Sequence, residues 1–144
     1  MNQEVNGPAS LLTMKQACDA LGMTYETLRF YCDEGLVPNL KRDKNNYRLF
    51  DGRDIRWLQS LQCLRRCGMG MKDMKRYQQL CMEGKSSIPQ RREILAQKRR
   101  ELRERMEELQ RSLDYIEEKQ AYFDAVQAGE IEYSSNLISV EETD

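Results

Sequence analysis

Apolar residues recur at helical spacing in two short segments near the start of the chain. The first runs over residues 14–21 and follows Thr13, which can form a capping box with Gln16. The second runs over residues 24–33, and Gly22 lies between the two segments. Two short helices joined by a glycine-containing turn form a helix-turn-helix, although an ordinary helical hairpin has the same pattern.

The next segment has a polar turn between a basic arm and an alternating, partly aromatic arm. Three cations lie within residues 41–44, Asn45 and Asn46 form the turn, and Tyr47–Phe50 form the second arm. This pattern predicts a short β-hairpin. A hairpin with cationic arms directly after a helix-turn-helix is typical of a wing that lies on the phosphate backbone of DNA.

Two further helices are predicted after the hairpin. The first runs from about Asp51 to Cys67, and the second begins at Met71 and ends near Gly84. The glycines at positions 68 and 70 separate these two helices.

The last helical pattern is a seven-residue repeat of apolar residues over positions 88–123. A helix from Pro89 to Ala128 would contain 40 residues and measure about 60 Å. A helix of this length with one apolar stripe needs a partner, and a second copy of the chain is the simplest one. The alternative is a helix folded back on its own domain. The residues predicted to form the dimer contact are Leu95, Leu102, Met106, Leu109, Leu113, Ile116 and Phe123.

The net charge of −1 over 144 residues conceals a segregation of charge along the chain. Residues 41–76 contain eleven Lys or Arg against four Asp, a net charge of +7, whereas residues 1–40 carry −3 and residues 77–144 carry −5. A concentrated basic segment is a candidate footprint for nucleic acid, and a solvated basic face has the same composition.

The composition excludes several classes of function. The chain contains no histidine, so it has neither a catalytic triad nor a histidine-based metal site. It contains no run of about 18 apolar residues, and its first residues lack the pattern of a signal peptide. We therefore expect a cytoplasmic protein that is not an enzyme, with no catalytic residues, metal, cofactor or membrane association.

A set of motifs occurs in a characteristic order within residues 11–84. The motifs are Thr27–Tyr31, Gly35–Pro38, Tyr47–Asp51, Asp54–Ile55 and Met71–Met74. In this combination the chain resembles the MerR family of bacterial transcription regulators, and the remaining residues match that family in layout only. The resemblance implies a mainly α fold: a winged helix-turn-helix head of four helices plus a short β-hairpin, followed by a long dimerisation helix that forms an antiparallel coiled coil.

The resemblance and the patterns together predict four segments. A flexible N-terminus covers residues 1–10, and the winged helix-turn-helix DNA-binding domain covers residues 11–84. The long dimerisation helix covers residues 85–129, and an acidic C-terminal tail covers residues 130–144. The sequence leaves the conformation of this tail open.

The family also implies a function and a set of DNA contacts. A homodimer would bind a pseudo-palindromic site in double-stranded promoter DNA and distort it, so that RNA polymerase is reached indirectly, through the promoter. Phe30 occupies a position where the family often has tyrosine, and Gly70 replaces a common serine cap. The residues that would lie at the DNA by matching position are Thr13, Tyr25, Arg29, Phe30, Arg42, Tyr47, Arg48 and Lys72.

One of the five cysteines is a candidate thiol sensor. Metal sensors of the family carry cysteine ligands at and beyond the start of the dimerisation helix, and no cysteine follows Cys81 here. Cys63 lies at the border of the apolar face of the third predicted helix, near Arg66, whose charge would favour a thiolate. The surrounding residues resemble the aldehyde- and electrophile-responsive branch of the family. The alternative is that all five cysteines are small core side chains.

Two further interpretations remain open at this point. In the first, the regulator responds to a small molecule that binds non-covalently. The binding site would lie between the long helix and the fourth helix, at Met71, Met74 and Tyr77. Alternatively, the chain is a helical adaptor that binds another protein through its coiled coil and does not bind DNA.

Overall fold

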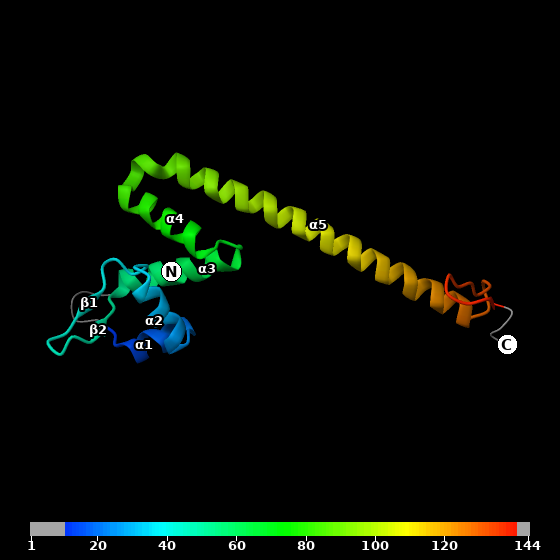
Figure 1. Ribbon diagram of the computed structural model, residues 1–144, viewed down its shortest axis with the longest axis horizontal. Coiled ribbons are helices and arrows are strands. Elements are labelled where there is room, and N and C mark those ends of the chain that lie inside the picture. Colours follow the sequence, from blue (N-terminus) through cyan, green and yellow to red (C-terminus); the bar gives the residue numbers. More distant parts are fainter. Residues whose placement is uncertain (1–10, 141–144) are drawn as a thin grey trace. The chain divides into compact units, whose positions relative to one another are not determined.

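The computed structural model describes residues 11–140, and these residues form two compact units that divide between Arg99 and Arg100. The order of helices and hairpin confirms the sequence prediction (Figure 1). The elements are α1 (Met14–Leu21), α2 (Tyr25–Asp33), β1 (Lys41–Arg42), β2 (Arg48–Leu49), α3 (Gly52–Arg66), α4 (Met71–Glu83), the 3₁₀ turn η1 (Gly84–Ser87) and α5 (Ile88–Gln127).

Local capping and turn chemistry form the helix-turn-helix. The Thr13 hydroxyl accepts a hydrogen bond from the Gln16 backbone N–H at 3.2 Å, and the Gln16 side chain accepts one from the Thr13 N–H at 2.9 Å. This is the predicted capping box. Gly22 ends α1 in the left-handed region with φ of 62°, where a side chain would be strained. The N-cap Thr24 follows two residues later, and α2 begins at Tyr25.

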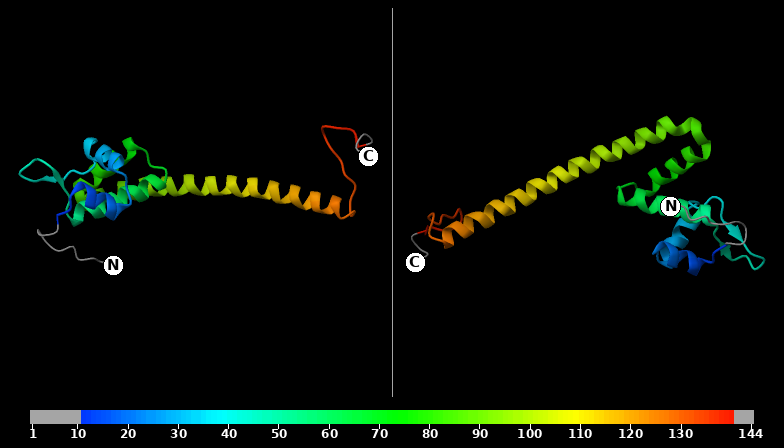
Figure 2. Two further views of the ribbon diagram at one scale, coloured as in Figure 1. Left: turned by 90° about the horizontal axis from the view of Figure 1, so that it is seen from below. Right: turned by 180° about the vertical axis from the view of Figure 1, so that it is seen from behind.

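The hairpin is short and is attached to the first residues of the head. β1 and β2 pair antiparallel with Arg42 opposite Arg48, and Asn46 adopts a positive φ of 68° in the turn between them. Beyond the strands, Leu12 and Phe50 exchange two backbone hydrogen bonds of 2.7 and 2.8 Å. The base of the hairpin is therefore fixed, while its tip projects away from the helices in both views of Figure 2.

One apolar core holds α1 to α4 and the hairpin together. Leu28 of α2, Phe50 beside β2, Leu58 of α3 and Met74 of α4 are completely buried in it. The indole N–H of Trp57 donates a hydrogen bond to the backbone carbonyl of Leu36 at 2.9 Å, which ties α3 to the loop after α2. These contacts fix the orientation of α2 and of the hairpin on the same scaffold.

The beginning of α5 belongs to this first unit. Ile94 packs against the core, and Lys98 forms an ion pair with Asp73 of α4, with 3.7 Å between nitrogen and oxygen. In the corner between α4 and α5, the Arg91 guanidinium donates to the Ser87 hydroxyl at 3.0 Å and to the Gly84 carbonyl at 2.8 Å. The corner is therefore held by side-chain contacts.

The second unit contains the rest of α5 and the residues that follow it as far as Val140. Gly129, with φ of 77°, lies just beyond the end of the helix, as the sequence predicts. The Ser134 backbone N–H donates to the Tyr122 hydroxyl at 2.7 Å, so this segment lies against the last turns of α5. The predicted N-terminal segment 1–10 and the last four residues of the acidic tail lie outside the described residues.

Candidate nucleic-acid interface

The side of α2 that faces away from the core carries three of the exposed residues proposed to contact DNA. Leu28 and Tyr31 bury one side of α2, and Tyr25, Arg29 and Phe30 remain exposed on the rest of its surface. The backbone N–H groups at the start of α2 add a partial positive charge beside Tyr25, which favours a phosphate at this end. The geometry suits a helix inserted into the major groove with its first turns toward the bases.

The tip of the hairpin is ordered by its own hydrogen bonds. The Asp43 carboxylate accepts from the backbone N–H groups of Asn45 and Tyr47 at 2.8 and 2.9 Å. The Arg42 guanidinium donates to the Asn46 carbonyl at 2.9 Å. Tyr47 is 69% exposed, and Arg42 is exposed beside it, so both side chains lie on the surface of a braced turn.

An ion pair joins the hairpin to the end of α2. Arg48 Nη2 lies 2.7 Å from Asp33 Oδ1, and Arg29 Nε lies 3.7 Å from Asp33 Oδ2. The Arg48 side chain is only 20% exposed, and its Nε is buried with no hydrogen-bond partner among the described residues. Asp33 therefore contacts two of the cations that the sequence assigns to the interface.

Lys41 and Lys75 also have acidic partners. Lys41 lies 2.8 Å from Asp51 and 3.1 Å from Asp54, the two carboxylates that cap α3. Burial works against the charge of Lys41, but the hydrogen bonds to both carboxylates outweigh it and raise the pKa of its amine above the usual value. Lys75 lies 2.7 Å from Glu34. These two cations of the basic segment are therefore paired with carboxylates of the head.

The remaining predicted DNA contacts lie at helix starts in the same unit. Thr13 is exposed at the N-terminus of α1 with its hydroxyl engaged in the capping box, and Lys72 is exposed in the first turn of α4. Gly70 precedes α4 and provides no side-chain cap, as expected. Of the eight residues proposed from the sequence, Arg48 differs from the other seven because it is partly buried in an ion pair.

A groove of about 580 Å³ lies beside this surface, between the turn before α2 and the end of α3. Phe30, Arg65 and Arg66 are among its lining residues. Cys63 is exposed near this groove, and its sulfur lies 3.4 Å from Arg66 Nη2. Sequence reasoning found Cys63 and Arg66 but not the groove, because α2 and α3 meet there only after folding.

The other four cysteines are at least partly covered. Burial raises the pKa of the Cys32 thiol to about 11, although the nearby Arg48 acts in the opposite direction. Burial and the charge of Asp19 raise the pKa of the Cys18 thiol. All five cysteines are free thiols, so Cys63 and Cys67 are not bridged.

The described residues bear on three other kinds of site: a metal site, a membrane-spanning helix and the proposed small-molecule site. Residues 11–140 contain no group of three or more acidic or cysteine side chains placed to hold a metal ion. The same residues include no helix that is both long enough and apolar enough to cross a membrane. At the proposed small-molecule site, Met74 is fully buried and Met71 and Tyr77 pack half-buried against the core.

Comparison with known proteins identifies relatives for most of the chain. The family model described as "MerR HTH family regulatory protein" matches residues 12–81, and the model described as "MerR, DNA binding" matches residues 55–119. An uncharacterised HTH-type transcriptional regulator of Haemophilus influenzae is 42% identical over 79 residues, which cover 55% of this chain and 58% of the relative. The HTH-type transcriptional regulator AdhR of Bacillus subtilis is 33% identical over 85 residues, which cover 59% and 61%. The matched stretches thus span about three fifths of these curated relatives.

Solved structures are similar over a larger share of the chain. HiNmlR, a MerR family regulator lacking the sensor domain, has been solved bound to promoter DNA. It is 36% identical, with a TM-score of 0.70 over 82% of this chain and 89% of that one. A putative MerR family transcriptional regulator from Listeria monocytogenes is 30% identical, with a TM-score of 0.72 and the same coverage.

Proposed function

The chain belongs to the MerR family of DNA-binding helix-turn-helix transcription regulators, and on this premise we propose that two copies bind one promoter site and control transcription from it. The observation that carries the proposal is the surface formed by α2 and the hairpin, which Asp33 and Arg48 join. HiNmlR, which is similar over most of its length, binds promoter DNA. The DNA-binding domain proposed here is residues 11–84.

Each part of this surface has a role in the proposed complex. Tyr25 and Arg29 on the first turns of α2 face base edges in the major groove, with Phe30 beside them. Arg42, Tyr47 and Arg48 place the wing on the phosphate backbone. Thr13 and Lys72 add backbone contacts at the starts of α1 and α4.

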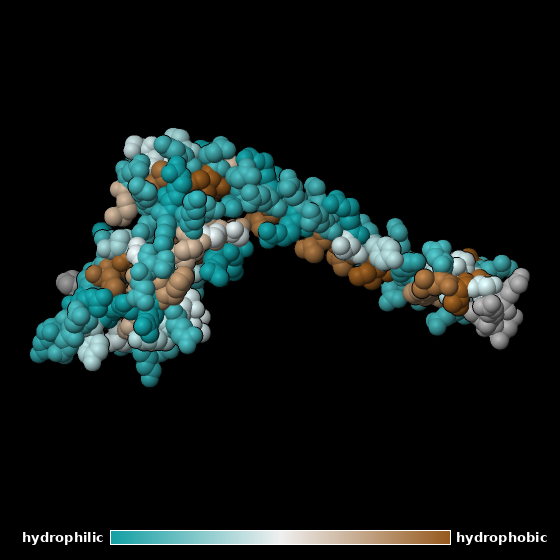
Figure 3. All heavy atoms as spheres, viewed as in Figure 1, coloured by the Kyte–Doolittle hydropathy of each residue, from teal (hydrophilic) through white to brown (hydrophobic). Residues whose placement is uncertain are grey.

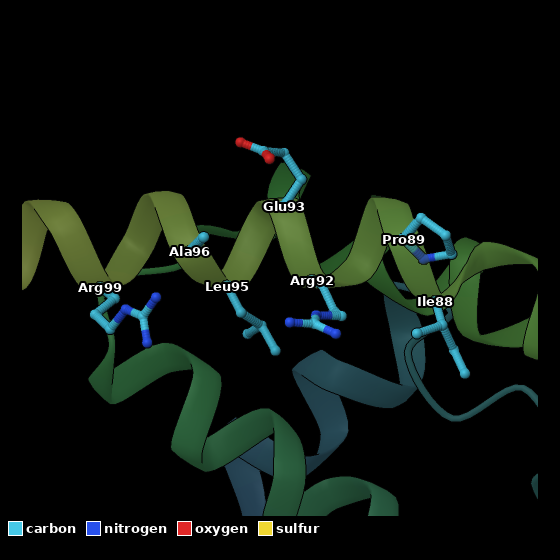
Figure 4. Close-up of a pocket in the computed structure, with 7 residues that line it drawn as sticks. All are labelled: Ile88, Pro89, Arg92, Glu93, Leu95, Ala96 and Arg99. Atoms are coloured by element: carbon cyan, nitrogen blue, oxygen red, sulfur yellow. The ribbon is translucent and has the colours of Figure 1, made fainter.

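The apolar stripe of α5 supports a homodimer. Leu95, Met106 and Leu109 are all exposed in the single chain, and apolar side chains follow one side of α5 in Figure 3. Figure 4 shows Ile88, Arg92, Leu95 and Arg99 on one side of the helix, at successive positions of the seven-residue repeat. An exposed stripe of this length is typical of a surface that a partner covers.

The charge pattern of α5 favours antiparallel pairing of the two copies. Residues 88–100 contain five Lys or Arg and one Glu, a net charge of +4. Residues 101–127 contain eight Asp or Glu and four Lys or Arg, a net charge of −4. A parallel pair would place like charges side by side, whereas an antiparallel pair places the basic part of one helix against the acidic part of the other.

The dimer would regulate by deforming its promoter. Bending or untwisting a site of this size costs on the order of 1–6 kcal/mol, and contacts at both half-sites would supply that free energy. RNA polymerase would respond to the altered spacing of the promoter elements, so its connection to this protein runs through the DNA.

The salt dependence of DNA binding tests the proposal. A duplex selected by the natural protein from a random-sequence pool (the selected duplex) should bind with an affinity that falls steeply as salt rises, because bound phosphates release counterions. Lys72→Gln should reduce the slope of log K against log salt by about 1.8, since the dimer carries two copies of Lys72. Gel shifts at four salt concentrations measure both quantities.

Lys85→Gln is the matched control, because this exposed lysine of η1 carries the same charge and is outside the proposed interface. The control should leave the slope within experimental error of the natural protein. A chain that forms dimers but binds no duplex at any salt concentration would instead be the helical adaptor.

We also propose that Cys63 is the thiol through which the regulator responds to aldehydes or other electrophiles. Cys63 is exposed, and its sulfur lies next to the Arg66 guanidinium. Arg66 lines the groove together with Phe30 of α2, so an adduct on Cys63 would have a route to α2 through Arg66. This response rests on Cys63 alone and is separable from DNA binding.

Pulse alkylation distinguishes Cys63 from the other thiols. At pH 8 a brief iodoacetamide pulse should label Cys63 fastest and Cys32 slowest, since with a pKa of about 11 roughly one Cys32 in a thousand is a thiolate at that pH. Peptide mass spectrometry measures the order of labelling. In a promoter–reporter strain, Cys63→Ser should abolish induction by an aldehyde and Cys18→Ser should not. Full induction with Cys63→Ser would reject the sensor role.

A further inference from the structure

Asp33 occupies a position between the two DNA-facing elements of the head. It is the last residue of α2, and its two carboxylate oxygens point to different cations. One oxygen lies 2.7 Å from Arg48 of the hairpin, and the other lies 3.7 Å from Arg29, one turn earlier on α2. A single carboxylate therefore spans the helix and the wing.

Within the hairpin alone, Arg48 would be repelled by a second arginine. Arg42 lies directly opposite Arg48 in the strand register, and like charges at opposite positions destabilise an antiparallel pair. Asp33 supplies the opposing charge, so Arg48 can stay beside Arg42. Since the Arg48 side chain is mostly buried, its guanidinium is held in one orientation.

Arg48 also keeps unused hydrogen-bonding capacity. A guanidinium has five N–H donors, and the contact with Asp33 uses Nη2 alone. Nε is buried without a partner in residues 11–140, so it is not the donor that a phosphate would reach. A guanidinium that is anchored on one edge by a carboxylate loses little further entropy when it donates to a phosphate. The carboxylate thus acts on DNA through the arginine.

We propose that Asp33 is a positioning residue of the DNA interface, which holds Arg48 and Arg29 so that the wing and α2 engage a cognate site together. This inference rests on the proposed DNA binding and extends it. Asp33 itself carries a negative charge, so its direct effect on any phosphate is repulsive. If Asp33 positions the arginines, neutralising it should lower the affinity for a cognate site. If Asp33 only repels phosphate, neutralising it should raise that affinity.

Asp33→Asn tests this proposal on two duplexes, the selected duplex and an unrelated mixed-sequence duplex of the same length. Affinity for the selected duplex should fall about tenfold, because each protomer loses one positioned ion pair worth a few-fold in affinity. Affinity for the unrelated duplex should stay equal or rise, because each protomer loses one negative charge. The ratio of the two affinities is a readout that reduced folding alone would not move.

The double variant Asp33→Asn with Arg48→Gln shows whether Asp33 acts through Arg48. In the Arg48→Gln background, Asp33→Asn should cost much less affinity for the selected duplex than it does in the natural protein, because only the contact with Arg29 is left to lose. An undiminished effect in that background would overturn the proposal. An equal rise on both duplexes would also overturn it, because it would reveal simple repulsion.

Glu34→Gln is the matched control. It removes one negative charge at the neighbouring residue and breaks the 2.7 Å pair with Lys75, so it should change the affinities for both duplexes by the same small factor. Thermal unfolding of each variant is measured alongside. An affinity loss on both duplexes together with a lowered Tm for Asp33→Asn would assign Asp33 a purely structural role. A natural protein that binds both duplexes equally would instead reject the proposed function.

Discussion

Replacing Leu109 and Leu113 together by glutamate should convert the protein to a monomer and reduce its affinity for the selected duplex by about a hundredfold or more. The two leucines are 61% and 52% exposed in the single chain and lie on the seven-residue repeat of α5. Four glutamates in the seam of a dimer would bury unpaired charge against apolar side chains, which is strongly unfavourable. A monomer engages one half-site only. Sedimentation equilibrium measures the association state, and gel shifts measure the affinity.

Arg111→Glu is the control for this double variant. It changes the net charge of each chain by the same amount, −2, at an exposed position between the two leucines that is off the apolar repeat. It should leave the protein dimeric. If the double glutamate variant also remained a dimer at micromolar concentration, the α5 seam would not be the dimer contact.

Phe50→Ala should lower the free energy of unfolding of the head by about 3–5 kcal/mol, the usual cost of removing a buried phenylalanine. Phe50 is 0% exposed, and its backbone joins the hairpin to Leu12 through two hydrogen bonds. Because small domains are stable by only about 5–15 kcal/mol, this loss would remove a large share of the stability of the head. Urea denaturation followed by Trp57 fluorescence measures the change.

Tyr47→Ala provides the comparison within the same hairpin. Tyr47 is exposed, so its loss should change the free energy of unfolding by no more than about 0.5 kcal/mol. It should still weaken DNA binding, because Tyr47 is a proposed wing contact. A loss below about 1 kcal/mol for Phe50→Ala would show that the hairpin does not share the core of the head.

The helices and the hairpin were predictable because their signals are local. The capping box of Thr13 and Gln16 spans three residues, and Gly22 ends α1 through its own φ angle. The seven-residue repeat in α5 likewise depends on spacing along the chain. The only interface ion pair visible at this level is that between Arg29 and Asp33, four residues apart on one helix.

The sequence did not show which individual Lys and Arg side chains form ion pairs within the head. Counting showed a net charge of +7 over residues 41–76, but Lys41, Arg48 and Lys75 in that segment have acidic partners in the structure. The partners of Arg48 and Lys75 lie 15 and 41 residues away along the chain. Such pairs form only when the core brings α2, the hairpin and α4 together.

The sequence alone thus determined the order of the α-helices and the hairpin, the ends of these helices to within about one residue, the apolar stripe of α5 and the region of basic charge. These properties depend on residues within about one or two helical turns of each other, where backbone geometry sets the distances. Only the tertiary structure decided that Asp33 bridges wing and helix, that Cys63 is exposed, and that Ile94 joins the core of the head. Those outcomes depend on packing between distant segments, which no local spacing specifies.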